Sequence, residues 1–233
     1  MHIFYTPDIE CVKELPEEES MHCARVLRLS EGEEIMLTDG RGSFYRAVLV
    51  RAHQKRCAVE ILSVTRQPRL WPVKIHMAVA PTKNMDRIEW FAEKATEIGI
   101  DALTLLRCRY SERKEVKTER VQKILVSAMK QSLKATLPEL TPMTDFKQFV
   151  SQPFDGQKFI AYCGEAQDKK ILKQLYRPGT DALILIGPEG DFSEEEVALA
   201  FENGFLPVSL GESRLRTETA ALTACHTIHV LNQ

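Results

Sequence analysis

The sequence lacks several features that would place the chain in a specialised class. Its longest apolar runs are about six residues, against the roughly 20 that cross a bilayer, and MHIFYTPDIE at the N-terminus is not a basic-then-apolar signal. Six scattered cysteines form no Cys-x-x-Cys pair, so the sequence predicts neither a zinc site nor a disulfide framework. We expect a soluble cytoplasmic protein with reduced thiols, no metal and no membrane partner.

The chain also lacks an overall excess of positive charge, since its formal net charge is -2. Cations gather locally, however: between Arg107 and Lys134 there are nine Lys or Arg residues against three Glu residues. Such a strip suits RNA phosphates, and it is equally typical of a solvated helix face on which Glu and Lys pair. Composition alone therefore leaves nucleic-acid binding open.

The first 66 residues show the pattern of short strands. Strands are predicted at 33–38, 43–50 and 57–64, with a glycine-containing hairpin turn at 39–42. Residues 20–28 favour a helical turn before them, and the two prolines within 66–72 indicate a linker. We predict a small β-barrel domain at 1–70.

From residue 73 onward strands alternate with helices, which predicts an α/β domain at 73–233 with a mainly parallel sheet covered on both faces. Such sheets bind ligands beyond the carboxyl ends of their strands. The predicted strands are 73–80, 102–107, 158–163, 181–187 and 206–210, and the predicted helices are 84–98, 117–132, 168–176, 194–203 and 217–231.

In the stretch LILIGPEGDFSEEE, the predicted strand at 181–187 is joined to a predicted helix by a turn that contains two glycines and a proline. Pro188 fixes φ and Gly190 permits close approach to the backbone, while Ser193 with Glu196 three residues later predicts a capping box. The chain has no G-x-x-x-x-G-K-[ST] or G-x-G-x-x-G phosphate cradle, and acidic side chains within the turn favour a ligand with cationic character. The alternative is a capped αβ turn without a ligand.

A second bare loop follows the strand at 206–210. It opens at Gly211 and ends in LRTETAA, which places Arg216 beside a predicted helix N-terminus. The helix dipole disfavours a cation there, so we interpret Arg216 as held for something it binds. An ion pair with Glu218 or Glu189 is the alternative.

Taken in order, these motifs closely resemble the ribosomal RNA small subunit methyltransferase E family of the SPOUT methyltransferases. The resemblance rests on GPEGDFS at 187–193 followed by LG-x-x-x-LRTETA at 210–220, and it extends over the whole chain. His22-x-x-x-Val-Leu-Arg28, Lys83-x-x-x-Arg87-x-Glu-Trp and Ser111-Glu-Arg113 match further family motifs. Members commonly have Ile where Arg214 stands, and Gly-Arg where Leu133-Lys134 stand.

The resemblance implies a PUA-like RNA-binding barrel, a C-terminal domain tied in a trefoil knot, and a homodimer. It implies S-adenosylmethionine as cofactor and methylation of N3 of one uridine in 16S rRNA within the small ribosomal subunit. Because uracil N3 must lose its proton, we expect Arg216, or a neighbouring guanidinium, to stabilise charge on the uracil, and Glu218, or else Glu189, to accept the proton. The residues expected to bind the cofactor are Ile186, Gly187, Pro188, Glu189, Gly190, Leu210, Gly211, Leu215 and Thr217.

Basic residues near the family motifs are expected to contact the RNA. For His22, a structural role within the folded domain is an equally good explanation. The expected set is His22, Arg25, Arg28, Lys83, Arg87, Arg113 and Lys134. A stripe of Leu222, Cys225 and Ile228 suits either a dimer contact or burial within one chain. The rival functions are a non-catalytic rRNA-binding module and a SPOUT methyltransferase for another RNA site; an α/β-hydrolase lacks its G-x-S-x-G motif here.

Overall fold

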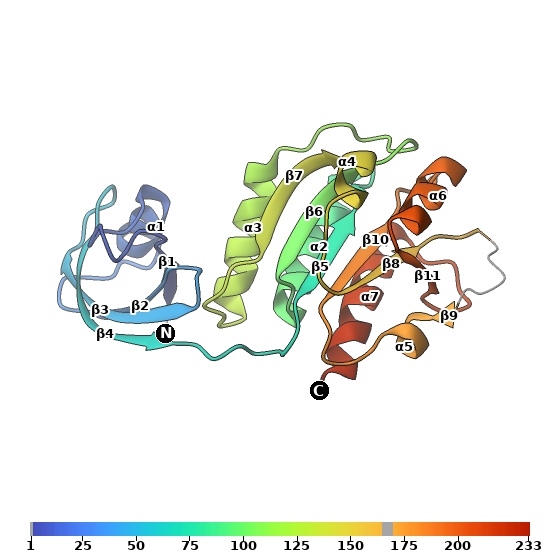
Figure 1. The fold of residues 1–233 in the computed structure, drawn as a ribbon. Helices are drawn as coiled ribbons and strands as arrows, with labels where there is room; N and C mark the ends of the chain where they lie inside the picture. The colour runs from blue at the N-terminus through green and yellow to red at the C-terminus, as the bar shows by residue number, and fades with distance from the viewer. Residues whose placement is uncertain (1, 165–169) are drawn as a thin grey trace. The chain divides into compact units, whose positions relative to one another are not determined.

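The computed structural model describes residues 2–164 and 170–233, and contacts divide the chain into two units (Figure 1). The N-terminal unit comprises Met1–Arg69 and Val126–Leu137, and the C-terminal unit comprises Leu70–Leu125 and Pro138–Gln233. The split near residue 70 lies at the predicted linker. The segment 126–137 clusters with the first unit, although the sequence pattern predicts it as part of the second domain.

The N-terminal unit contains a four-stranded mixed sheet of order β1-β2-β3-β4. Its strands are β1 (Ile3–Tyr5), β2 (Glu34–Thr38), β3 (Ser43–Arg51) and β4 (Ala58–Arg66). β1 runs parallel to β2, and the other pairs are antiparallel. The turn between β2 and β3 contains two glycines at positive φ, as its sequence predicted, and Asp39 Oδ1 accepts the Arg41 N–H at 2.7 Å.

The predicted helical turn at 20–28 is divided between two short elements. Helix α1 (Glu17–Met21) leads directly into the π-helix η1 (His22–Val26). Arg28 then has a φ of 57°, which is uncommon for a residue with a side chain, and the Leu29 N–H donates to the Cys23 carbonyl at 3.1 Å. A hydrogen-bonded turn at Arg28 therefore ends this segment, from which the side chains of His22, Arg25 and Arg28 are exposed.

The C-terminal unit contains a seven-stranded parallel sheet of order β7-β6-β5-β10-β8-β11-β9. Its strands are β5 (Ile75–Val79), β6 (Ala102–Arg107), β7 (Glu139–Asp145), β8 (Gln157–Ala161), β9 (Lys170–Ile171), β10 (Ala182–Ile186) and β11 (Leu206–Ser209). Its helices are α2 (Met85–Ile98), α4 (Phe146–Val150), α5 (Leu172–Leu175), α6 (Glu194–Glu202) and α7 (Thr217–Leu231), and α3 (Thr118–Gln131) begins in it.

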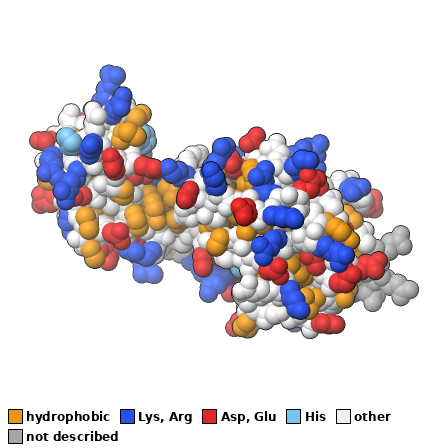
Figure 2. Space-filling view, turned by 90° about the horizontal axis from the view of Figure 1, so that it is seen from above, with side chains coloured by type: hydrophobic (Ala, Val, Ile, Leu, Met, Phe, Trp, Pro, Cys, Tyr) orange, Lys and Arg blue, Asp and Glu red, His pale blue; other side chains and the backbone are white. Residues whose placement is uncertain are grey.

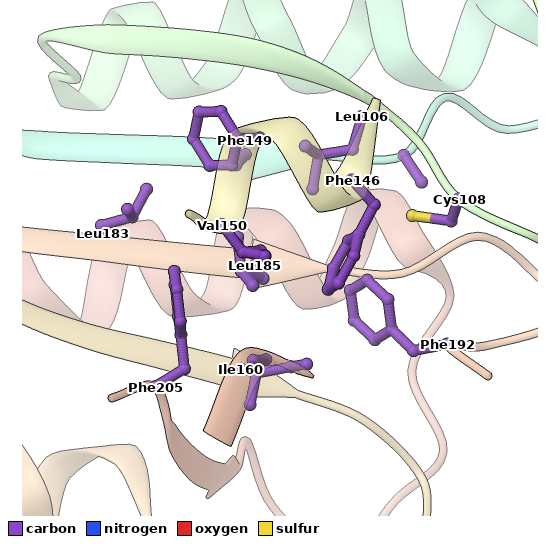
Figure 3. Packing of buried hydrophobic residues seen from close by; sticks show 13 residues of the cluster. Leu106, Cys108, Phe146, Phe149, Val150, Ile160, Leu183, Leu185, Phe192 and Phe205 are labelled. Atoms are coloured by element: carbon purple, nitrogen blue, oxygen red, sulfur yellow. The ribbon is translucent and has the colours of Figure 1, made fainter. Parts of the chain in front are cut away.

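Helices cover this sheet on both faces. On one face α7 packs against α2, β5 and β10, whereas α4 and α6 lie together on the other. Five consecutive buried residues in β10 reflect this two-sided cover. Figure 3 shows the cluster beneath α4, in which Phe146, Phe149 and Val150 pack with Leu185 of β10 and with Phe192 from the loop after β10.

Four elements were not predicted, namely β1, β7, α4 and β9, and the helix expected at 168–176 is only partly present. Its first two residues, 168 and 169, lie outside the described residues, and the rest contains β9 and the four-residue α5. Within the described ranges, no helix is long and apolar enough to span a bilayer. The trefoil knot implied by the family resemblance stays a prediction.

Candidate functional site

A cavity of about 930 Å³ lies at the carboxyl ends of three neighbouring strands, β10, β8 and β11. Its wall combines the loop after β10 (186–191), the end of β8 (161–163) and the loop between β11 and α7 (208–217), with Arg87 and Ala220 beside them. The two loops singled out by sequence therefore meet at one site. The predicted cofactor residues that line it are Ile186, Gly187, Pro188, Glu189, Gly190, Leu210, Gly211, Leu215 and Thr217.

The loop after β10 is held rigidly. The Asp191 N–H donates to the Pro188 carbonyl at 2.9 Å, and Asp191 has a φ of 65°. The predicted capping box is present: Ser193 Oγ accepts the Glu196 N–H at 3.3 Å, and Glu196 Oε2 accepts the Ser193 N–H at 2.9 Å. Phe192 anchors the loop in the core beside Phe146 (Figure 3), and the two ring centroids lie 5.4 Å apart.

Side-chain hydrogen bonds connect the loops that surround the cavity. Thr217 Oγ1 donates to the Gly187 carbonyl at 3.1 Å, which joins the loop after β10 to the start of α7. Asp191 Oδ2 accepts the Cys163 N–H at 2.7 Å from the end of β8. Glu189 Oε1 accepts the Lys83 N–H at 3.0 Å, so this carboxylate also fastens the loop that precedes α2.

Gly211 has a φ of 133° and needs to be glycine for its backbone conformation. Ser209 Oγ bonds to both the Gly211 carbonyl and its N–H, at 3.0 and 3.2 Å. The following residues, including Arg214, are exposed up to the half-buried Leu215. This loop therefore offers backbone groups and two guanidiniums, those of Arg214 and Arg216, to the cavity.

Arg216 is the N-cap residue of α7, and its side chain is exposed on the cavity wall. Among the described residues its guanidinium forms no ion pair, and the alternative pairing with Glu218 or Glu189 is not observed. Glu218 instead lies 3.8 Å from Arg87, between its Oε1 and the arginine Nε. Its side chain is 10% exposed and does not line the cavity, and its Oε2 is buried without a hydrogen-bond partner.

The residues expected to bind RNA lie in both units. In the C-terminal unit, Arg113 Nη2 donates to the Lys83 carbonyl at 2.6 Å, and Lys83 Nζ lies 2.8 Å from Glu112. In the N-terminal unit, the side chains of His22, Arg25 and Arg28 are exposed, and His22 lies edge-on to Phe4. Lys134 differs from the others because it is only 7% exposed, which removes its side chain from easy contact with a phosphate.

The strip between Arg107 and Lys134 is partly neutralised. Arg107 lies 3.5 Å from Asp145, Arg109 lies 3.6 Å from Glu195, and Arg120 lies 2.6 Å from Glu89. On the face shown in Figure 2, cationic and anionic side chains alternate without forming one large patch of a single sign. For Arg107, Arg109 and Arg120, the strip therefore behaves as a solvated surface on which cationic and acidic side chains pair.

Sequence reasoning missed the contribution of β8 to the site. Tyr162 and Cys163 line the cavity after this strand, and burial, with a smaller contribution from the Asp191 carboxylate, raises the pKa of Tyr162. Both residues lie at the carboxyl end of a predicted parallel strand, and that position could have identified them as part of the site. Within the described residues no disulfide is formed, and no cluster of His, Cys, Asp or Glu is arranged to hold a metal.

Comparisons with known proteins agree with this arrangement. Residues 69–229 match the model of an RNA methyltransferase domain, and residues 15–62 match that of an RNA methyltransferase PUA domain. The ribosomal RNA small subunit methyltransferase E of a Synechocystis species is 30% identical, with coverage of 96% of this chain and 74% of that protein. The Bacillus subtilis protein of the same name is 29% identical, with coverage of 91% and 87%.

Solved structures extend the similarity to the full fold. A probable rRNA-methyltransferase from Porphyromonas gingivalis is 46% identical with a TM-score of 0.93, over 100% of this chain and 98% of that one. A ribosomal RNA small subunit methyltransferase E from Neisseria gonorrhoeae, bound to S-adenosyl methionine, is 30% identical with a TM-score of 0.87, over 99% and 98%. Because it matches these relatives over nearly its own whole length, the chain belongs to the ribosomal RNA small subunit methyltransferase E family.

Proposed function

We propose that this protein transfers a methyl group from S-adenosylmethionine to N3 of one uridine in 16S rRNA of the small ribosomal subunit. Membership of the family supports the reaction. The observation that carries the proposal is the single cavity at which the loops after β8, β10 and β11 meet. Because the substrate is ribosomal RNA, we place the reaction in the cytoplasm.

The cavity fits this cofactor chemically. Its volume of about 930 Å³ suits a nucleoside-sized ligand. The backbone of 186–190 and of 210–211 offers polar groups for the edge of an adenine, and carboxylates and guanidiniums on the same wall suit the ammonium and carboxylate of the methionine part. When bound, the cofactor supplies an electrophilic methyl group on a sulfonium.

Arg216 is the residue that we propose to act on the uracil. N3 of uracil carries a proton, and it becomes a good nucleophile only when that proton is lost. The Arg216 guanidinium is exposed on the cavity wall and has no ion-pair partner among the described residues, so it is available to stabilise negative charge on the uracil oxygens.

Glu218 is the proposed proton acceptor. Its Oε2 is buried and lacks a hydrogen-bond donor, which is an unfavourable state that a substrate N–H would relieve. Because the carboxylate lies behind the cavity wall beside Arg87, the role requires the Arg87 side chain to move when RNA binds.

RNA recognition is proposed to use both units. Exposed cations at Arg25 and Arg28 would contact phosphates from the N-terminal unit, and Lys83, Arg87 and Arg113 would do so near the cavity. The uridine has to be unpaired or flipped out, because N3 lies on its pairing edge.

A homodimer is also proposed, through the neighbouring helices α2 and α7. Trp90 of α2 is 44% exposed and Val230 of α7 is 52% exposed, whereas Cys225 and Ile228 of the predicted stripe are fully buried within the chain. Internal packing thus explains Cys225 and Ile228, whereas Leu222 is half-buried, and the dimer proposal depends on the two exposed side chains. Replacing both with glutamate should convert a dimer into a monomer in light scattering; a wild-type monomer would contradict the proposal.

Nucleoside mass spectrometry tests the reaction. Small subunits from cells that lack this protein would be incubated with the purified protein and methyl-labelled cofactor, and the 16S rRNA digested. We expect label in 3-methyluridine at one position. No incorporation would support a non-catalytic RNA-binding module, and label in another nucleoside or RNA would assign a different substrate.

A further inference from the structure

A rigid turn after β6 presents an aromatic side chain that no proposed role uses. The Cys108 N–H donates to Ser111 Oγ at 3.0 Å, and the Ser111 N–H donates to the Cys108 carbonyl at 3.1 Å. The Arg109 N–H donates to Glu196 Oε1 at 2.8 Å, which fastens the turn to the start of α6. Cys108 and Ser111 are buried, whereas Tyr110 between them is 51% exposed.

Tyr110 lies directly against the cofactor loop. A Cβ atom added to Gly190 would stand 3.0 Å from the Tyr110 Cβ, so the bare glycine is what allows the tyrosine to approach so closely. Gly190 lines the cavity of 930 Å³. Tyr110 therefore stands against the loop that lines the cofactor cavity without lining the cavity itself, and the Arg109 guanidinium lies 6.0 Å from the centroid of its ring.

A second cavity, of about 710 Å³, begins at the same turn. Arg109 and Ser111, the two neighbours of Tyr110, line it together with the ends of β6 and β7 and the start of α6. The turn 108–111 thus borders the second cavity, and its Tyr110 contacts the loop that lines the first.

The charges in the second cavity leave free cations. Asp145 lies 3.5 Å from Arg107, Glu195 lies 3.6 Å from Arg109, and Glu196 accepts the backbone N–H groups of Arg109 and Ser193. Lys114 and Lys147 also line this cavity, are exposed, and form no ion pair within the described residues. Glu115 lines the cavity too, is exposed and forms no ion pair within the described residues, so two lysines and one glutamate remain available there, with a net positive charge.

We infer that Tyr110 stacks against a base of the substrate RNA beside the cofactor cavity, and that Lys114 and Lys147 hold phosphates of the adjoining nucleotides in the second cavity. The inference rests on the proposed function. A uridine taken out of its stack to expose N3 loses stacking energy, and a fixed aromatic ring returns part of it, about 1–3 kcal/mol per base.

The test compares Tyr110→Ala, Tyr110→Leu and Tyr110→Phe in the full-length protein. Binding of a fluorescein-labelled single-stranded oligouridine is measured by anisotropy, and methylation of small subunits is measured in a single turnover. We expect Tyr110→Ala and Tyr110→Leu to weaken RNA binding about 5- to 100-fold and Tyr110→Phe to retain it, because only the ring is needed. Leu206→Ala, which removes an apolar side chain that is 44% exposed at the start of β11, the end of the strand away from the cavity, is the control and should bind RNA like the wild type.

Two further measurements separate RNA contact from other roles. Affinity for S-adenosylmethionine should be unchanged in Tyr110→Ala; a parallel loss would mean that the tyrosine only supports Gly190, and would overturn the inference. Lys114→Gln with Lys147→Gln should lower the slope of log affinity against log salt by about 1.4, since each phosphate contact on a single strand contributes about 0.7. An unchanged slope would remove the second cavity from the RNA path.

The outcome is distinguishable from failure of the proposed function. If the wild type methylates rRNA and Tyr110→Ala binds RNA and methylates at the same rate, the inference is wrong and the proposed function stands. If the wild type transfers no methyl group, the proposed function is wrong. Oligouridine binding that is still weakened by Tyr110→Ala would in that case support the inferred contact between Tyr110 and an RNA base. A change of oligomeric state in Tyr110→Ala would assign the ring to a contact between copies and would also overturn the inference.

Discussion

The hydrogen bond from Thr217 Oγ1 to the Gly187 carbonyl should be a measurable link between the two cofactor loops. Thr217→Val removes the hydroxyl and keeps the shape of the side chain, which is 8% exposed. The change breaks a buried hydrogen bond and leaves its carbonyl acceptor without this donor, at a cost of about 1–3 kcal/mol. Because the bond connects the start of α7 to the loop after β10, the loss should be divided between the free energy of unfolding and the affinity for S-adenosylmethionine.

Urea unfolding with and without saturating cofactor measures both parts. We expect the two losses to sum to about 1–3 kcal/mol, with the cofactor share corresponding to a weakening of up to about 100-fold. Thr227→Val is the control, since the Thr227 hydroxyl donates at 2.8 Å to the Thr223 carbonyl within the same helix. A summed loss below about 0.5 kcal/mol, or an equal cofactor effect in the control, would refute the idea that this bond joins the loops.

Three other changes test the site and its support. Arg216→Ala should lower the rate of methyl transfer at least about 100-fold while cofactor affinity is mostly kept; turnover near wild type would remove Arg216 from the mechanism. Ser193→Ala should lower the free energy of unfolding by about 1 kcal/mol through loss of the N-cap, and an unchanged urea midpoint would contradict this. Burial lowers the pKa of His76 from 6.5 to about 4. The unfolded chain therefore binds the proton first, and about 3 kcal/mol of stability, complete above pH 6.5, should be lost as pH falls to 4. His76→Gln should reduce that dependence, and an identical pH profile would contradict the assignment.

The sequence predicted the elements that carry the site well, because local signals coincide there with tertiary packing. The strand at 102–107 and the helix at 217–231 have the predicted bounds, and the Ser193–Glu196 capping box is present. Glycine, proline and cap residues mark such ends through backbone conformation alone, so a single sequence reveals them.

The missed elements lack such signals. β7 (ELTPMTD) contains a proline and alternates weakly, which suits only the edge position that it occupies in the sheet. α4 has only five residues, and its role depends on the contact of Phe146 with Phe192, 46 positions later. The burial of Glu218 beside Arg87 is likewise a tertiary fact, since no local pattern distinguishes it from the exposed Arg216 two residues earlier.

The central claim is that the loops after β8, β10 and β11 form one binding site for S-adenosylmethionine. Calorimetric titration of the cofactor into the wild-type protein tests it most directly. We predict saturable heat with one site per chain, competed by S-adenosylhomocysteine and weakened in Thr217→Val. A titration without saturable heat, or binding that Thr217→Val and a bulky replacement of Gly190 both leave unchanged, would contradict the claim.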